Sequence, residues 1–279
     1  MITKTVTNLK ILNKPFLRWA GGKNWFISHF LELIKDLDFN NYHEPFLGGG
    51  SVFFSINNDN KNYLSDFNDD LINCFKQVKE QPKLLISTLI DFPQNEEFYY
   101  KIREKNFNSE LKMAARFIYL NKTSFNGLYR VNSMGKYNVP YGKKKFDITN
   151  ISELIESCSL QLKNTELVSA DFKEFIHNVK KNDLVYLDPP YTITHNNNGF
   201  VKYNEKLFSF VDQQRLSILI DQIRKRKAYY ILSNAYHPDV KKIYDKFGDK
   251  VISLNRTSMI AANSQSRENY KEYVFTNIK

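Results

Sequence analysis

The chain has 279 residues, 42% of them hydrophobic and 25% charged, which is enough for one large domain or a domain with an insertion. Its net charge of +10 favours a polyanionic partner, although an AT-rich genome that is rich in lysine codons would give the same excess. Cys74 and Cys158 stand apart from any cluster, so neither a zinc site nor a disulfide framework is expected. Without an apolar leader or a run of about 20 apolar residues, the chain is predicted to be cytoplasmic, with no membrane partner.

The first part of the chain has the pattern of an α/β fold. After a loose lead-in, apolar residues at helical spacing predict a helix over 24–37. A short strand at 42–46 runs into three glycines, and residues 51–57 are predicted to form a helix. The next strand, 63–65, ends at Asp66. This order of strand, glycine-rich turn, helix, strand and acidic residue indicates the opening of a Rossmann-like fold.

The middle of the chain loses this alternation. From Asp70 to Leu120 the apolar pattern is helical, and residues 124–145 break it with glycines, prolines and basic residues that predict a loop or an irregular hairpin. Because strands resume only near Leu167, we expect an inserted, mainly helical domain. The expected division is a catalytic domain of residues 1–70 and 166–279 and an insertion of residues 71–165.

The last part of the chain returns to strands. Three are predicted before polar residues, at 167–170 before Asp171, at 183–187 before Asp188, and at 228–232 before Ser233-Asn234. An amphipathic helix is predicted at 211–224, and residues 251–255 and 270–276 are predicted to close the sheet as an antiparallel pair.

The sharpest motif is Asp188-Pro189-Pro190-Tyr191, directly after the apolar strand. Parallel strands carry ligand sites at their carboxyl ends, and two prolines remove two N–H donors and restrict the backbone. The Asp188 carboxylate and the Pro189 carbonyl are then adjacent acceptors that suit a planar amino group, and Tyr191 can stack on its ring. Such acceptors would stabilise the charge that develops when an exocyclic amine attacks a methyl group. The alternative is a turn whose aspartate caps a helix.

Three further segments are typical of an adenosine site. The glycines at 48–50 let a ligand approach the backbone, but their spacing fits neither a dinucleotide motif nor a P-loop. Asp66 is placed to accept from ribose hydroxyls, and Asp171-Phe172 could contact an adenine ring. Lys23, at the entry of the first helix, could bind a carboxylate, although a Gly-Gly-Lys sequence is more often a solvated turn. A site without a phosphate cradle suits S-adenosylmethionine better than NAD or ATP.

Residues 125–142 combine guanidinium, amide and aromatic side chains on one constrained loop. Arginine suits guanine and asparagine suits adenine in the major groove of DNA. The lysines at 143–145 would neutralise phosphates. An exposed basic hairpin with no such role is the alternative.

Six segments now occur in one order, and together they resemble the Dam-like, DpnII-type adenine-N6 DNA methyltransferases. This is the α-group, in which the cofactor motifs come first and the recognition domain is inserted. The resemblance covers nearly the whole chain. The segments are Trp-Ala-Gly-Gly-Lys at 19–23, Glu-Pro-Phe-Leu-Gly-Gly-Gly at 44–50, Asp66, Phe-Asn-Gly-Leu-Tyr-Arg-Val-Asn at 125–132, Asn-Val-Pro-Tyr-Gly at 138–142, and Asp-Pro-Pro-Tyr at 188–191.

The resemblance implies a seven-stranded sheet of the S-adenosylmethionine-dependent methyltransferase fold, with an inserted helical target-recognition domain. It also implies that the target adenine is flipped out of double-stranded DNA, mostly within GATC and in some members within a longer site containing GAT. No metal is implied. A cognate restriction endonuclease accompanies some such enzymes, and the source would be a bacterium, with the protein at its nucleoid, or a phage.

Residue roles follow from the resemblance by position. The cofactor contacts would be Trp19, Lys23, Phe46, Asp66, Asp171, Phe172 and Asp188. The adenine would be held by Asp188, Pro189 and Tyr191. The DNA contacts would be Asn126, Leu128, Arg130, Asn132, Pro140, Tyr141 and Phe200. The stretch His195–Phe200 departs from the family pattern, and the polar loop Asn263–Arg267 matches a family region close to DNA.

Other functions stay open at this point. Neither cysteine adjoins a proline, which argues against cytosine-C5 methylation. Methylation of RNA or of a protein amide is a second hypothesis, but protein-glutamine methylases carry Asn where this chain has Asp188. A non-catalytic DNA-binding module is a third.

Overall fold

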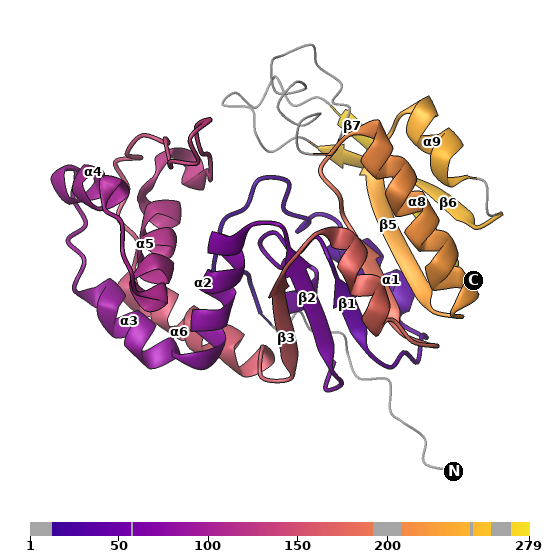
Figure 1. Cartoon of the computed structure of the whole chain (residues 1–279), viewed down its shortest axis with the longest axis horizontal. Coiled ribbons are helices and arrows are strands. Elements are labelled where there is room, and N and C mark those ends of the chain that lie inside the picture. The colour runs from indigo at the N-terminus through magenta and orange to yellow at the C-terminus, as the bar shows by residue number, and fades with distance from the viewer. Residues whose placement is uncertain (1–12, 57, 192–207, 246–247, 258–268) are drawn as a thin grey trace. The chain divides into compact units, whose positions relative to one another are not determined.

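The computed structural model describes residues 13–56, 58–191, 208–245, 248–257 and 269–279. Within them, seven strands form one sheet in the order β3-β2-β1-β4-β5-β7-β6 (Figure 1). β1 runs parallel to β2 and β4, β4 runs parallel to β5, and β7 is antiparallel to both β5 and β6. The seven-stranded α/β sheet and its antiparallel closing pair are therefore confirmed. The strands are β1 (Tyr42–Glu44), β2 (Asn62–Asp66), β3 (Thr165–Ser169), β4 (Leu184–Leu187), β5 (Tyr229–Ala235), β6 (Lys250–Thr257) and β7 (Asn269–Thr276).

Helices fill the chain between β2 and β3, and side-chain caps mark where several of them begin. Asn68, Ser109 and Asp147 each accept a hydrogen bond from a backbone N–H of the first turn that follows them. The α-helices are α1 (Ile27–Ile34), α2 (Asp69–Glu80), α3 (Pro82–Ile90), α4 (Glu96–Glu104), α5 (Glu110–Thr123), α6 (Ile148–Gln161), α8 (Phe210–Lys225) and α9 (Pro238–Tyr244). The 3-10 helices are η1 (Phe53–Ser55), η2 (Phe125–Gly127) and η3 (Phe172–Asn178).

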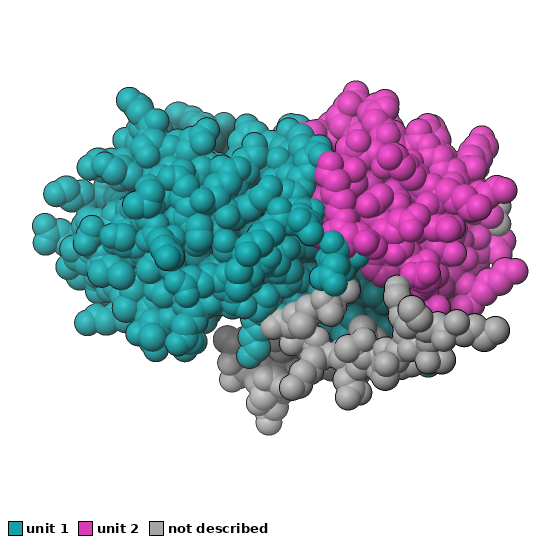
Figure 2. Space-filling view, turned by 90° about the horizontal axis from the view of Figure 1, so that it is seen from below, with its two compact units in different colours: residues 1–35, 47–59, 66–169 teal, residues 36–46, 60–65, 170–279 magenta. Residues whose placement is uncertain are grey.

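The chain divides into two compact units (Figure 2). Unit 1 comprises residues 1–35, 47–59 and 66–169, and unit 2 comprises residues 36–46, 60–65 and 170–279. Unit 1 holds α1 to α6, whereas unit 2 holds β4 to β7 with α8 and α9. The functional boundaries expected near residues 70 and 166 stay a prediction.

The core of unit 2 explains why its central strand is so apolar. All four residues of β4 are buried, and Val185 and Leu187 pack in one cluster with Leu216, Ile220 and Ile223 of α8. A parallel strand with neighbours on both sides and helices on its faces needs such a continuous apolar run.

The helix predicted at 51–57 is wrong. The structure has only the single 3-10 turn η1, and Ile56 is already extended, with φ −97° and ψ 148°. The Ser55 hydroxyl donates to the carbonyl of Val52 at 2.7 Å, a local bond that competes with helix propagation. Asn58 and Asn60 follow, and asparagine favours turns over helix interiors.

A buried hydrogen bond joins β1 to the residue that precedes β4. His43 Nε2 lies 2.9 Å from Asp183 Oδ2, and both side chains are fully buried. The Asp183 carboxylate also accepts from the backbone N–H of Lys180, at 2.8 Å, and from the backbone and side chain of Asn41, at 3.0 and 3.1 Å. Burial alone would raise the pKa of Asp183, but the bonds from His43, Lys180 and Asn41 hold this pKa below its ordinary value.

We predict that Asp183→Ala lowers the free energy of unfolding by about 3–5 kcal/mol, because it leaves several buried donors without an acceptor. Urea denaturation at neutral pH measures this change. The matched control is Asp38→Ala, since Asp38 is exposed, and its effect should stay within about 0.5 kcal/mol. A loss below about 1 kcal/mol for Asp183→Ala would contradict a structural role for the pair.

The Asp183 carboxylate also makes the stability of the fold depend on pH. Because the folded-state pKa lies below the unfolded value of about 3.9, Asp183 stabilises the fold above that pH. Its contribution is lost as the pH falls through the folded-state pKa. The difference in stability between wild type and Asp183→Ala should therefore shrink on acidification.

Candidate active site

The side chain of Asp188 is held from the neighbouring strand. Asp188 follows β4 directly, and Ser233 of β5 donates its hydroxyl to Asp188 Oδ1 at 2.8 Å. The Tyr186 hydroxyl lies 3.2 Å from the Ser233 hydroxyl, which must accept this bond because its own hydrogen is given to Asp188. Burial, with the nearby Asp188 carboxylate, raises the pKa of Tyr186 well above its ordinary value, so Tyr186 stays a donor. The chain Tyr186–Ser233–Asp188 thus fixes the orientation of the carboxylate.

Tyr191 is anchored on the last strand. Its hydroxyl donates to Glu272 Oε2 of β7 at 2.5 Å, and Glu272 is 2% exposed. Burial, followed by the charges of Glu272 and Asp188, raises the pKa of Tyr191 well above its ordinary value. Tyr191 therefore stays protonated, and its ring is held at the hydroxyl end. Pro189, between Asp188 and Tyr191, is buried.

In unit 1, Asp66 shapes the glycine-rich turn. Its Oδ2 accepts from the backbone N–H of Gly48 at 2.9 Å, and its Oδ1 accepts from that of Asn68 at 3.0 Å. Burial raises the pKa of Asp66, and these N–H groups partly offset the rise. Each oxygen keeps capacity for a second hydrogen bond, as a carboxylate offers about four acceptor positions.

Trp19 lies against the same turn. Gly48 has φ +50°, and a Cβ atom there would lie 2.9 Å from Trp19 Cδ1, so the close approach requires glycine. The Trp19 ring stacks at 5.3 Å on Tyr129 and at 6.2 Å on Phe117. Lys23, in the turn that leads to α1, is only 4% exposed.

The aromatic residues predicted beside the cofactor form a cluster in unit 2. Phe46 stacks on Phe172 at 5.3 Å, and Phe208 contacts both rings. Phe172 is 8% exposed, and the guanidinium of Arg215 lies 4.7 Å from its ring centre. Arg215 also donates to Asp171 at 2.8 Å, and Asp171 caps η3. Burial raises the pKa of Asp171, but its bonds to the Lys173 N–H and to Arg215 bring the pKa below its ordinary value.

Residues 124–142 form an irregular hairpin with isolated bridges between Ser124 and Tyr141 and between Val131 and Tyr137. Asn132 builds its tip, because its side-chain oxygen accepts from the N–H groups of Met134 and Lys136, each at 3.0 Å. This structural use of Asn132 was not expected from the sequence.

Five other predicted DNA contacts lie on or beside this hairpin. The exposed Arg130 donates through Nε to the Asn138 side chain at 2.8 Å and through Nη2 to the Asn138 carbonyl at 3.2 Å. Asn126 is exposed in a left-handed conformation with φ 55°, and Leu128 is 38% exposed.

The other two predicted contacts, Pro140 and Tyr141, lie at the end of the hairpin. The carbonyl of the exposed Pro140 accepts from the N–H of Phe125 at 2.9 Å, and the centre of the half-buried Tyr141 ring lies 5.2 Å from that of Tyr99. Phe200, His195 and the loop 263–267 lie outside the described residues.

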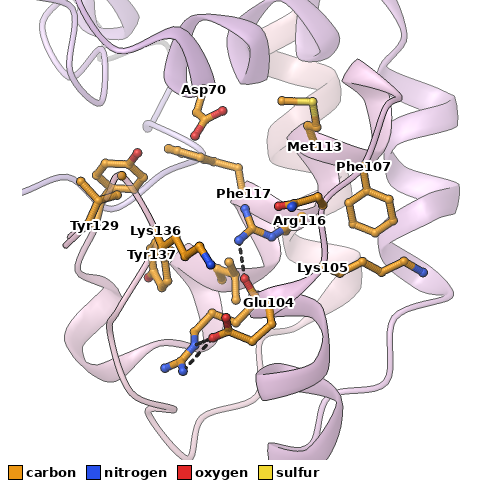
Figure 3. A pocket seen from close by; sticks show the side chains of 15 residues that line it. Asp70, Glu104, Lys105, Phe107, Met113, Arg116, Phe117, Tyr129, Lys136 and Tyr137 are labelled. Atoms are coloured by element: carbon orange, nitrogen blue, oxygen red, sulfur yellow. Dashed lines mark hydrogen bonds and ion pairs between the residues drawn. The ribbon is translucent and has the colours of Figure 1, made fainter. Parts of the chain in front are cut away.

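A cavity of about 320 Å³ opens beside the hairpin in unit 1 (Figure 3). Phe117, Tyr129 and Tyr137 line it together with Arg116 and Lys136. Burial lowers the pKa of Arg116 from its ordinary value, and nearby acidic groups oppose this effect. None of the residues predicted to contact the cofactor lines this cavity.

The described residues contain no group of three or more His, Cys, Asp or Glu side chains that could hold a metal ion. None of their helices is long and apolar enough to cross a membrane.

Comparison with known proteins decides the family. The model of the D12 class N6 adenine-specific DNA methyltransferases matches residues 19–260. The chain belongs to this family. It is therefore an adenine-specific DNA methyltransferase, and the family implies a DNA substrate and a methyl donor of the S-adenosylmethionine type.

Three relatives align with this chain over most of its length and of theirs. The chain is 36% identical to a Type II methyltransferase of Lactococcus lactis subsp. cremoris, with 96% of each protein covered. It is 38% identical to a Type II methyltransferase of Methanocaldococcus jannaschii, covering 87% of this chain and 92% of the relative. It is 31% identical to a DNA adenine methylase of Haemophilus influenzae, covering 95% and 94%.

Sequence reasoning did not assign roles to Ser233, Glu272 and Tyr186. Ser233 carried a signal, since a polar residue follows the apolar run of β5, but its partner Asp188 lies 45 residues away. Glu272 carried a weaker signal, as a carboxylate directly before the apolar run Tyr273–Phe275.

We predict that Ser233→Ala lowers kcat for methyl transfer by about tenfold to a hundredfold, because a hydrogen bond to a charged group contributes about 1.5–3 kcal/mol. Single-turnover kinetics on duplex DNA measures the effect. The matched control is Ser217→Ala, which removes a buried serine of α8 that donates to the Ile243 carbonyl at 3.3 Å. Equal losses in the two variants would mean that Ser233 has only a structural role.

Proposed function

We propose that this methyltransferase transfers a methyl group from S-adenosylmethionine to N6 of an adenine flipped out of duplex DNA, within the site GATC. The observation that carries the proposal is the pair of anchored side chains after β4. Ser233 orients the Asp188 carboxylate, and Glu272 holds the Tyr191 hydroxyl. A carboxylate and an aromatic ring on one rigid Asp-Pro-Pro-Tyr turn suit an adenine, which presents an amino group on a flat ring.

The residues present fit S-adenosylmethionine. The turn at Gly48 has no side chain between its backbone and Trp19, and the Asp66 carboxylate is fixed at the end of β2. We assign the cofactor contacts to Trp19, Lys23, Phe46, Asp66, Asp171, Phe172 and Asp188, with Asp66 accepting from the ribose hydroxyls. The cofactor supplies a methyl group that is activated by its attachment to a sulfonium.

The chain's own groups act on the adenine. Asp188 and the Pro189 carbonyl accept the two N6 hydrogens, which favours a tetrahedral nitrogen with an available lone pair, and Tyr191 stacks on the ring. The cofactor would supply the methyl group to N6 and keep the electron pair of the broken carbon–sulfur bond on its sulfur, and N6 would release one proton to water. The positive charge that develops on N6 is stabilised by the fixed Asp188 carboxylate.

We assign recognition of the site to the inserted domain of residues 71–165. Arg130, Asn126, Leu128 and Tyr141 lie on the hairpin or its base, and together with Asn132, Pro140 and Phe200 they are the proposed DNA contacts. The net charge of +10 supports binding to the phosphate backbone. We place the enzyme in the cytoplasm, at the nucleoid of a bacterium or in a phage-infected cell, with or without a cognate restriction endonuclease.

We predict that Asp188→Ala lowers methyl transfer at least a hundredfold, about the loss when one preorganised stabilising group is removed, while the fold is retained. Incorporation of labelled methyl groups into two duplexes that differ only in one GATC measures both rate and site. The exposed Asp239→Ala is the control, and circular dichroism checks folding. Near-normal turnover in Asp188→Ala would contradict the assigned role, and equal incorporation into both duplexes would contradict GATC.

We predict that Arg130→Ala costs about 1–3 kcal/mol of base discrimination, the range for a bidentate contact to guanine. The measurement is kcat/KM on GATC and on duplexes with one substituted base. The control is Lys143→Ala, because a phosphate contact should weaken all duplexes alike. An unchanged preference in Arg130→Ala would place base reading elsewhere in 125–142.

A further inference from the structure

One buried amide in unit 1 ties together two distant segments of the chain. Asn121, near the end of α5, is 2% exposed. Its Nδ2 donates to the Arg18 carbonyl at 2.7 Å and to the Gly127 carbonyl at 3.2 Å, and its Oδ1 accepts from the Arg18 N–H at 2.9 Å. Arg18 and Asn121 are 103 residues apart in the sequence. The amide thus connects the segment of Trp19 and Lys23 to the base of the hairpin.

The two segments also pack directly against each other. Trp19 stacks on Tyr129 of the hairpin, and Phe117 of α5 contacts both rings. Gly127 has φ +66°, and a Cβ atom there would lie 2.6 Å from Arg18 Cδ, so a methyl group there would displace the Arg18 side chain. The base of the hairpin therefore lies in close contact with the segment of Arg18 and Trp19.

An amide is the side chain that this position requires. It must donate twice and accept once within a buried space, and among short uncharged side chains only asparagine carries two donors and an acceptor. A substitution would leave two carbonyls and one N–H without partners, each at a cost that loosens the contact between the segments.

We propose that Asn121 is a positioning residue that couples cofactor binding to base recognition. The inference rests on the proposed function, in which Trp19 and Lys23 contact the cofactor and the hairpin reads the site. A cofactor that orders the Trp19 segment then orders the hairpin through Asn121. Because such coupling is reciprocal, cognate DNA tightens cofactor binding by the same factor.

The experiment compares two dissociation constants of S-adenosylhomocysteine, measured by equilibrium dialysis without DNA and with a GATC duplex. Their ratio in the wild type should lie between about 5 and 150, the usual range for coupled sites. In the full chain carrying Asn121→Ala, the ratio should fall to within about twofold of 1. The kcat/KM preference for GATC over a duplex with one substituted base should fall with it.

Two further variants complete the test. Asn73→Ala is the matched control, since Asn73 is an amide of α2 that donates to the Glu110 carbonyl at 2.9 Å, and it should leave both ratios unchanged. Asn121→Asp keeps the size of the side chain and its acceptor for the Arg18 N–H but removes the two N–H donors, so it should lower the coupling even if Asn121→Ala does not fold.

The outcomes separate the two proposals. A wild type that methylates GATC selectively with a coupling ratio of 1 overturns the role of Asn121, and so does an Asn121→Ala variant that keeps both ratios while losing stability. If Asn121→Ala cannot be folded, an unchanged ratio in Asn121→Asp overturns it. A wild type that shows no preference for GATC overturns the proposed function instead.

Discussion

A parallel sheet that is covered on both faces can offer polar side chains to a ligand only where its strands end. β4 shows this constraint, because all four of its residues are buried while Asp183 precedes it and Asp188 follows it. β2 likewise delivers Asp66 at its last position. The covered interior forces the polar residues to these ends, and the order of the strands decides which of them share an edge.

Hydrogen bonds from buried or half-buried polar side chains set the shape of the turns that would contact a ligand. Asp66 fixes the glycine-rich turn, Ser233 and Glu272 fix the Asp-Pro-Pro-Tyr turn, and Asn121 fixes the base of the hairpin. Each of these side chains stands on or next to a regular element. Because a buried polar group without a partner costs free energy, the turn it bonds has little freedom to adopt another conformation.

The sequence allowed the strands and the main motifs to be predicted because apolar runs that end in polar residues carry a strong local signal. The apolar stretch at 51–57 predicted a helix that the structure does not have. The hydrogen bond from the Ser55 hydroxyl to the Val52 carbonyl and the asparagines that follow end the turn there. The sequence pattern also gave no hint of α9, whose start depends on His237 as a cap before Pro238. The partners of Asp188 and Tyr191 lie 45 and 81 residues away, and residue types alone do not say which distant side chains will pair.

Under the proposed function, the two aspartates that flank β4 serve separate purposes, one stability and the other methyl transfer. Asp183 holds the fold together at the amino end of the strand, in a pair with His43 that no ligand needs to touch. Asp188 stands at the other end, where the Asp-Pro-Pro-Tyr turn begins. A lineage that adapts to heat or acidity can therefore vary the residues around the first carboxylate while selection on DNA methylation constrains the second. Because the two carboxylates lie at opposite ends of β4, natural selection can change the stability of the fold and the rate of methyl transfer separately.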